Sequence, residues 1–203
     1  MANEYNKLTA KIYDPVLDPF IKDLRKRVVI EAKRLGAKKI IDLCCGTGHQ
    51  LKFFNTKDFE QVIGIDLSPH MVEIAEKYKV NCTVGDATQT PFEDNSFDLA
   101  MVSFALHEKP WDLAKSIVDE AYRIVRPQGH FLVVDYIRNN KTHWWGRTMT
   151  WTIERLVGGE HYRNFLRFIE KGGVYKMVDN FSFVKEIPLF KNSVGIMIFQ
   201  KDR

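Results

Sequence analysis

The 203-residue chain predicts an α/β fold in which helices cover both faces of a mostly parallel sheet. Two observations support this prediction. Short apolar runs typical of buried strands alternate with segments of helical periodicity, and a glycine-containing turn follows the first of these runs. The expected strands are 38–42, 61–65, 80–84, 97–103 and 130–136. Hydrophobic residues make up 45% of the chain, which is enough for a core, and we expect a single domain.

The first helix has a start signal and a stop signal. Asp18 is expected at its N-cap and Pro19 at its first position, and Gly36 is expected to end it. The residues that share its apolar face are Ile21, Leu24, Val28, Ala32 and Leu35.

Two further helices lie between the expected strands. Ser68 and Pro69 predict the start of the second in the same way as Asp18 and Pro19 predict the first. The third is expected from about Trp111 to Val125, and the segment 126–129 then turns the chain into the fifth strand.

The alternation ends after residue 136. Residues 139–176 combine aromatic and cationic side chains and predict two helices, roughly 143–157 and 161–171. Two last runs, Phe181–Ile187 and Val194–Gln200, are joined by a short loop and predict an antiparallel pair at the sheet edge.

Charge and composition limit the classes of function. The net charge of +4 is too small to indicate nucleic-acid binding by itself. Cations gather between Lys22 and Lys39, where they form either a solvated helix face or a surface attracted to anionic membranes. No run is long enough to span a bilayer and no secretory signal is evident, so we expect a cytoplasmic protein.

Three cysteines, Cys44, Cys45 and Cys82, lie on or beside expected core strands. An odd number of buried thiols argues against a disulfide framework. Their apolar surroundings give no metal site, and we expect none in the chain.

The segment from Asp42 to Gly48 carries the strongest functional signal. Its small residues allow a ligand to approach the backbone, and the following helix offers unpaired N–H donors. Asp42 can accept a hydrogen bond from an ammonium group. Asp66 ends the next strand, about 20 residues past the loop, where an acid is placed to hold a ribose hydroxyl pair. Asp86 follows the third strand and could accept from an exocyclic adenine amine.

Each of these acids also has a structural interpretation, since Asp66 and Asp86 could simply cap the turns at the ends of their strands. Taken together with the loop, they favour a nucleotide-like cofactor at the C-terminal ends of the strands.

With these motifs the chain resembles the class I S-adenosylmethionine-dependent methyltransferases, in the methyltransferase type 11 group, and locally the ubiquinone/menaquinone C-methyltransferases. The matching segments are 42–48, 65–71, 85–87, 92–98 and 120–129. The resemblance implies a Rossmann-like seven-stranded sheet with the last strand antiparallel. It also implies methyl transfer from S-adenosylmethionine to a small-molecule acceptor, either quinone-like or lipid-like, with S-adenosylhomocysteine as product.

The resemblance assigns cofactor roles by position. Asp66 is expected to bind the ribose, while Asp86 and Ala87 face the adenine and Leu67 and Met71 pack on its ring. The other residues assigned to the cofactor site are Tyr13, Asp42, Cys44, Gly46, Thr47, Gly48 and Ser103. Cys44 stands where the family often has glycine, so we expect the loop to differ slightly there. Tyr13 belongs to an N-terminal segment that either folds over the cofactor or only packs against the domain.

His107 is the candidate general base, because it follows the fourth strand and an imidazole suits proton transfer near neutral pH. A capping or loop histidine is the alternative. His143 and His161 lie in the variable region and could meet the substrate.

The whole chain, 1–203, is therefore expected to be one methyltransferase domain. Its parts are an N-terminal arm and helix (1–36), a cofactor-binding core (38–136), a helical substrate lid inserted after the fifth strand (139–176) and a C-terminal strand pair (181–203). The lid could instead touch a membrane surface. Two other functions stay open: a nicotinamide-dependent oxidoreductase, and a non-catalytic cofactor-binding module.

Overall fold

The computed structural model describes residues 7–55, 57–137, 151–152, 154–155 and 159–203, and for residues 7–20 the backbone alone. Within these residues seven strands form one sheet in the order β3-β2-β1-β4-β5-β7-β6. They are β1 (Lys39–Leu43), β2 (Gln61–Asp66), β3 (Cys82–Val84), β4 (Phe97–Ser103), β5 (Val125–Tyr136), β6 (Ser182–Leu189) and β7 (Val194–Gln200). Only β7 runs antiparallel to its neighbours, β5 and β6. The predicted mostly parallel sheet with an antiparallel last strand is confirmed.

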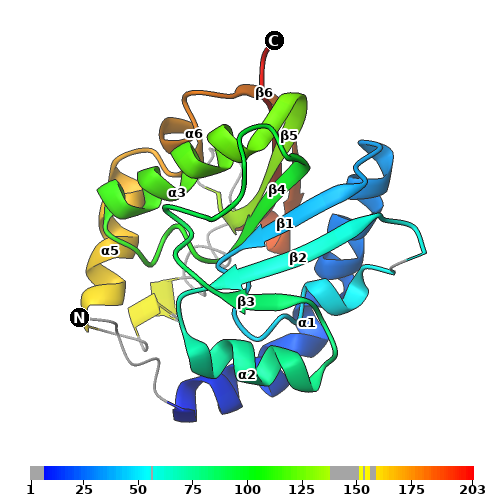
Figure 1. Cartoon of the computed structure of the whole chain (residues 1–203). Coiled ribbons are helices and arrows are strands. Elements are labelled where there is room, and N and C mark those ends of the chain that lie inside the picture. Colours follow the sequence, from blue (N-terminus) through cyan, green and yellow to red (C-terminus); the bar gives the residue numbers. More distant parts are fainter. Residues whose placement is uncertain (1–6, 56, 138–150, 153, 156–158) are drawn as a thin grey trace.

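Helices flank this sheet. They are α1 (Lys7–Arg34), α2 (Pro69–Lys77), α3 (Trp111–Ile124), α5 (Gly159–Glu170) and the short α6 (Val174–Met177), with 3₁₀ turns at Leu51–Phe53 and Phe190–Asn192. In Figure 1, α3 lies in front of β4 and β5, whereas α1 passes behind β1 and β2. Large side chains fill the space between these layers, and Phe97, Phe131 and Phe199 are almost completely buried.

The strands agree with the predicted ranges to within two residues except at β5, which begins at Val125 and not at residue 130. The segment 126–129 was predicted as a turn before the strand, and this prediction was wrong. Pairing with β4 shifts between Phe97↔Val125 and Leu99↔His130, so the extra residues form a bulge inside the strand. Gln128, with φ of 65°, absorbs the change of direction.

The predicted start of the first helix was also wrong. The helix α1 begins at Lys7, so Asp18 is not an N-cap and Pro19 lies inside the helix. An interior proline removes one hydrogen bond of the helix and favours a kink, but the helix need not begin at that residue. The predicted end is confirmed, because Gly36 follows α1 with φ of 67°, a left-handed conformation that favours glycine.

The start of α2 follows its prediction. Pro69 is its first residue, and the Ser68 hydroxyl accepts a hydrogen bond from the Met71 N–H at 3.4 Å. The third helix likewise begins at Trp111.

The C-terminal region bears out the predicted strand pair. β6 forms the edge of the sheet, and β7 lies between β5 and β6. The predicted helix 161–171 corresponds to α5. The predicted helix 143–157 lies mostly outside the described residues.

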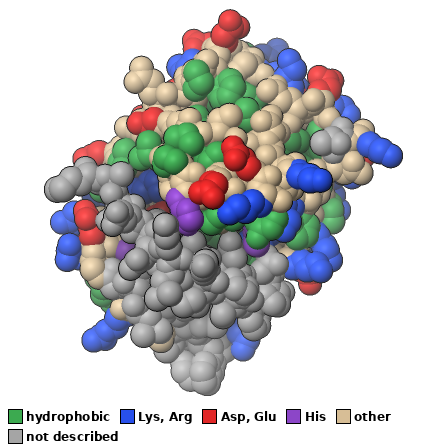
Figure 2. Space-filling view, turned by 60° about the horizontal axis from the view of Figure 1, so that its bottom comes forward, with side chains coloured by type: hydrophobic (Ala, Val, Ile, Leu, Met, Phe, Trp, Pro, Cys, Tyr) green, Lys and Arg blue, Asp and Glu red, His purple; other side chains and the backbone are tan. Residues whose placement is uncertain are grey.

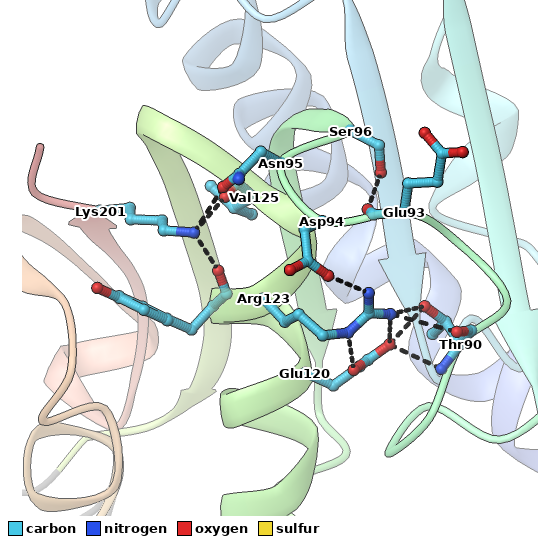
Figure 3. Close-up of polar contacts among 10 residues, drawn as sticks. Thr90, Glu93, Asp94, Asn95, Ser96, Glu120, Arg123, Val125 and Lys201 are labelled. Atoms are coloured by element: carbon cyan, nitrogen blue, oxygen red, sulfur yellow. Dashed lines mark hydrogen bonds and ion pairs between the residues drawn. The ribbon is translucent and has the colours of Figure 1, made fainter.

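A polar network fixes the loop before β4 to α3 (Figure 3). The Glu120 carboxylate accepts from the Thr90 N–H at 2.7 Å and from the Thr90 hydroxyl, and Arg123 donates to the same carboxylate at 2.7 and 2.8 Å. Arg123 also donates to Asp94. Lys201, just after β7, donates to the carbonyls of Tyr122 and Val125 at the end of α3. Loop, helix and last strand are thereby connected.

The cations at the C-terminal half of α1 are arranged as on a solvated helix face. Lys26, Lys33 and Arg34 pair with Asp23, Asp58 and Glu31. Figure 2 shows another face, on which the described Lys and Arg side chains are scattered with acidic side chains between them.

Among the described residues, no helix combines the length and the hydropathy that crossing a bilayer requires.

Candidate active site

The ends of β1 and β2 are joined by a single carboxylate. Asp66, the last residue of β2, accepts from the Gly46 N–H at 2.8 Å with one oxygen and from the Ser68 N–H at 2.9 Å with the other. Cys45 also donates its N–H to the carbonyl of Ile65. Asp66 therefore links the loop after β1 to the start of α2, as its capping interpretation predicts. Because a carboxylate has about four acceptor positions, it can still accept from a ligand.

Asp42 lies one residue before the C-terminal end of β1 and is only 1% exposed. Its Oδ1 atom is buried and has no hydrogen-bond partner among the described residues. Burial raises the pKa of this carboxyl well above its usual range, and the negative groups of Cys82 and Asp66 raise it further, while Arg25 opposes them. The hydroxyl of Ser103, at the end of β4, is buried without a described partner as well. Unsatisfied buried acceptors and donors of this kind mark places where a polar ligand fits.

The loop itself keeps the conformation that glycine favours. Cys44 has φ of 63°, and Gly46 and Gly48 have φ of 54° and 70°. We expected Cys44 to alter the loop, but it adopts the left-handed conformation, which costs a residue with a Cβ atom about 1–2 kcal/mol. Such strain is typical of functional sites.

The two glycines of the loop differ in their surroundings. A Cβ atom on Gly46 would meet nothing within 4 Å, so this side of the backbone is open. A Cβ on Gly48 would lie 2.7 Å from Val80 and 3.0 Å from Ala75. Gly48 is therefore needed for close packing on α2, whereas Gly46 leaves room for a ligand.

The remaining predicted cofactor residues surround the same strand ends. Leu67 is 62% exposed, Met71 is half-buried, and Thr47 and Ala87 are buried. The exposed Asp86 accepts from both the N–H and the hydroxyl of Thr88, so it caps its turn. Tyr13 lies within α1, in the part whose side chains are not described.

His107 is buried in the loop that follows β4. Its Nδ1 atom lies 2.7 Å from Oδ1 of Asp135 in β5. Burial lowers the pKa of the imidazole, but the carboxylates of Asp135, Glu154 and Glu108 outweigh this effect and raise the pKa to about 9. A raised pKa favours the protonated imidazole, which must lose that proton before it can act as a base. Its role as a base stays a prediction.

Helical residues after β5 complete the surroundings of His107. Glu154 accepts from the Tyr136 hydroxyl at 2.7 Å, and its Oε1 lies 3.6 Å from Nε2 of His107. His161 in α5 places its Nε2 2.7 Å from the other oxygen of Glu154. In the same helix, Asn164 donates to the carbonyl of Glu108. α5 therefore packs over the loop that carries His107.

Sequence reasoning missed two acidic members of this group. Asp135 interrupts the apolar run of β5, and an acid inside a buried strand was a signal that could have revealed it. Glu154 had no such signal, because its partners come from distant parts of the chain. His161 was noted, and it does join the group, whereas His143 lies outside the described residues.

The sheet order, with its antiparallel last strand, matches the Rossmann-like fold of methyltransferases. Residues 41–133 match the family model described as "Methyltransferase domain". The chain is similar to class I S-adenosylmethionine-dependent methyltransferases.

Similar proteins include two demethylmenaquinone methyltransferases. The one from Thermotoga maritima is 28% identical and aligns over 86% of this chain and 82% of its own length. The one from Staphylococcus saprophyticus is 31% identical over 56% of this chain, and the match spans about half, 51%, of that relative. An O-methyltransferase family protein from Burkholderia thailandensis shares the fold, with a TM-score of 0.69 at 16% identity over 98% of this chain and 61% of its own.

Proposed function

We propose that this chain binds S-adenosylmethionine at the C-terminal ends of β1, β2 and β4 and transfers its methyl group to a small quinone-like ring compound. The sulfonium supplies an already activated methyl group. The residues of the chain therefore have to bind the donor, align the acceptor and exclude water.

The observation that carries the proposal is the unsatisfied carboxyl of Asp42. A buried acceptor without a partner is costly, and an ammonium group is the ligand that compensates it best. The amino-acid part of S-adenosylmethionine provides such a group. The open side of Gly46 lies in the same loop, and Asp66, at the tip of the neighbouring strand, can accept from ribose hydroxyls.

The acceptor class rests on the relatives. The demethylmenaquinone methyltransferases act on a quinone, as their name states, and the Thermotoga relative aligns with most of this chain. The aromatic side chains of Phe165 and Phe168, on the buried face of α5 beside His107, suit a site for an aromatic ring. A reduced ring would also offer hydroxyl protons for which a base such as His107 is useful.

Isothermal calorimetry tests donor binding. We expect the full chain to bind S-adenosylhomocysteine, and Asp42→Asn to weaken this binding by roughly tenfold or more, since an amide offers the ammonium group no charge. Glu93→Asn, at an exposed position in the loop before β4, is the control. Tight binding of NADH with no response to S-adenosylhomocysteine would instead establish the oxidoreductase alternative.

Turnover needs a separate measurement. Transfer of labelled methyl from S-adenosylmethionine to a demethylated naphthoquinol supports the acceptor class. Donor binding without labelling of this acceptor or of any compound in a cell extract would favour the non-catalytic module.

A further inference from the structure

We propose that His107, Glu154 and His161 form a binding site for a divalent transition-metal ion such as Zn²⁺, Co²⁺ or Fe²⁺. Each residue offers one ligand atom, and these three atoms lie within 4.8 Å of one another. Both imidazoles present Nε2 to Glu154, at 3.6 Å for His107 and 2.7 Å for His161. Two histidines and one carboxylate are a ligand set that suits these ions.

Outer carboxylates support both histidines. Nδ1 of His107 lies 2.7 Å from Asp135, and Nδ1 of His161 lies 3.5 Å from Glu108. A carboxylate that accepts the Nδ1 proton fixes the tautomer in which Nε2 has a lone pair for the metal, and metal-binding histidines almost always have such a partner. Asp135 is itself held by the N–H of Tyr136 at 2.7 Å. The group therefore contains three candidate metal ligands and, beside the two imidazoles, the carboxylates that would orient them.

The geometry requires an adjustment of the ligand side chains. Metal bonds of about 2.0–2.1 Å in a tetrahedron place two ligand atoms about 3.3 Å apart. Nε2 of His161 and Oε2 of Glu154 would have to separate by roughly half an ångström, and Nε2 of His107 lies 3.6 Å from the other oxygen, Oε1, so the carboxylate would have to turn or bind through both oxygens. Burial favours a bound ion, because His107 and Glu154 are each 3% exposed and His161 is 19% exposed.

Three protein ligands leave at least one position open to a further ligand. On the proposed function, an oxygen of the acceptor ring would occupy that position. The ion would then stabilise the anionic form of the acceptor, in place of a base role for His107. Metal binding itself does not depend on that function, so we test it without any methyl donor or acceptor.

The test uses Co²⁺ with the metal-free full chain. We expect equilibrium dialysis to give one tightly bound ion per chain. The visible absorption should be that of a four- or five-coordinate site, without the strong near-ultraviolet bands that sulfur ligands from the three cysteines would add. His161→Ala and Glu154→Gln should each weaken binding at least tenfold. His70→Ala and His130→Ala, which change histidines outside the group, should bind as the unchanged chain does.

Circular dichroism establishes that each variant is folded. If Glu154→Gln does not fold, the less buried His161→Ala still decides the question. The proposal is overturned if the unchanged chain binds no Co²⁺, if the spectrum reports sulfur ligands, or if a folded His161→Ala variant binds as tightly as the parent. Metal binding without methyl transfer would leave the metal site standing and would contradict the proposed function instead.

Discussion

Cys44 shows how a single residue can be kept in a conformation that its side chain opposes. Its φ of 63° belongs to the left-handed region, where a Cβ atom is crowded. The loop keeps this shape because Gly46 and Cys45 donate their N–H groups to Asp66 and to the carbonyl of Ile65. The contacts of the neighbouring residues therefore outweigh the preference of Cys44.

Glycine and alanine at position 44 measure this strain directly. At an ordinary position alanine is the more stabilising of the two, by about 0.4–1 kcal/mol, because it restricts the unfolded chain. At this φ we expect the opposite order, with Cys44→Gly more stable to urea than Cys44→Ala by about 1 kcal/mol. If alanine were the more stable variant, residue 44 would not have a left-handed backbone in solution.

Asp66 has a structural role, and the proposed function adds a binding role. We expect Asp66→Ala to weaken binding of S-adenosylhomocysteine by about 1–3 kcal/mol, because ribose hydroxyls lose a charged acceptor and the Gly46 N–H loses its partner. Calorimetry measures this change. Asp86→Ala is a useful comparison, since Asp86 caps its own turn on a neighbouring strand end. Unchanged affinity in a folded Asp66→Ala variant would contradict the assigned geometry.

At the scale of elements, polar networks fix the segments that the hydrophobic core does not. The loop from Thr90 to Asp94 lies on α3 through Glu120 and Arg123 (Figure 3). The Glu120 carboxylate is 6% exposed. Burial works to raise its pKa, but hydrogen bonds from Arg123 and Thr90 outweigh burial and lower the pKa.

This lowered pKa gives a pH-dependent stability. The contribution of Glu120 is complete above the unfolded pKa of about 4.3 and is lost as the pH falls through the lower folded value. We expect Glu120→Gln to reduce the free energy of unfolding by about 2–3 kcal/mol at pH 7. Urea titrations from pH 7 to pH 3 should show the two stability curves converging in acid. Glu93→Gln, an exposed neighbour, should follow the unchanged chain at every pH.

How far the elements could be predicted depends on where their signals lie. The buried parallel strands are short apolar runs, so their positions follow from the sequence alone, as β1, β2 and β4 show. Pro19 suggested a helix start that α1 does not have, because a local signal cannot exclude helical residues before it. In the candidate site, Asp42 and Asp66 could be predicted because they belong to a recognisable sequence motif. Glu154 could not be predicted, because its contacts with His107 and Tyr136 exist only in the folded chain.

At the scale of the whole molecule, ligand binding and folding stability are coupled. A ligand that binds only the folded chain at 100 times its dissociation constant stabilises it by about 2.7 kcal/mol, which for a domain of this size raises Tm by roughly 5–10 °C. We expect S-adenosylhomocysteine to produce this shift in a thermal melt and NADH to produce none. An equal shift with both compounds would mean that the site does not discriminate between them.

The place of β7 between β5 and β6 has a consequence for synthesis on the ribosome. β7 comes after the other six strands in the sequence, yet it lies in the interior of the sheet. Until residues 194–200 have emerged from the ribosome, β5 is missing one of its two neighbouring strands and β6 has no neighbouring strand. A nascent chain that stalls earlier exposes unpaired strand edges, which attract chaperones or other chains. Completion of this sheet therefore waits until the last of its seven strands has been made, although the loop proposed to bind the donor, residues 42–48, is made well before that strand.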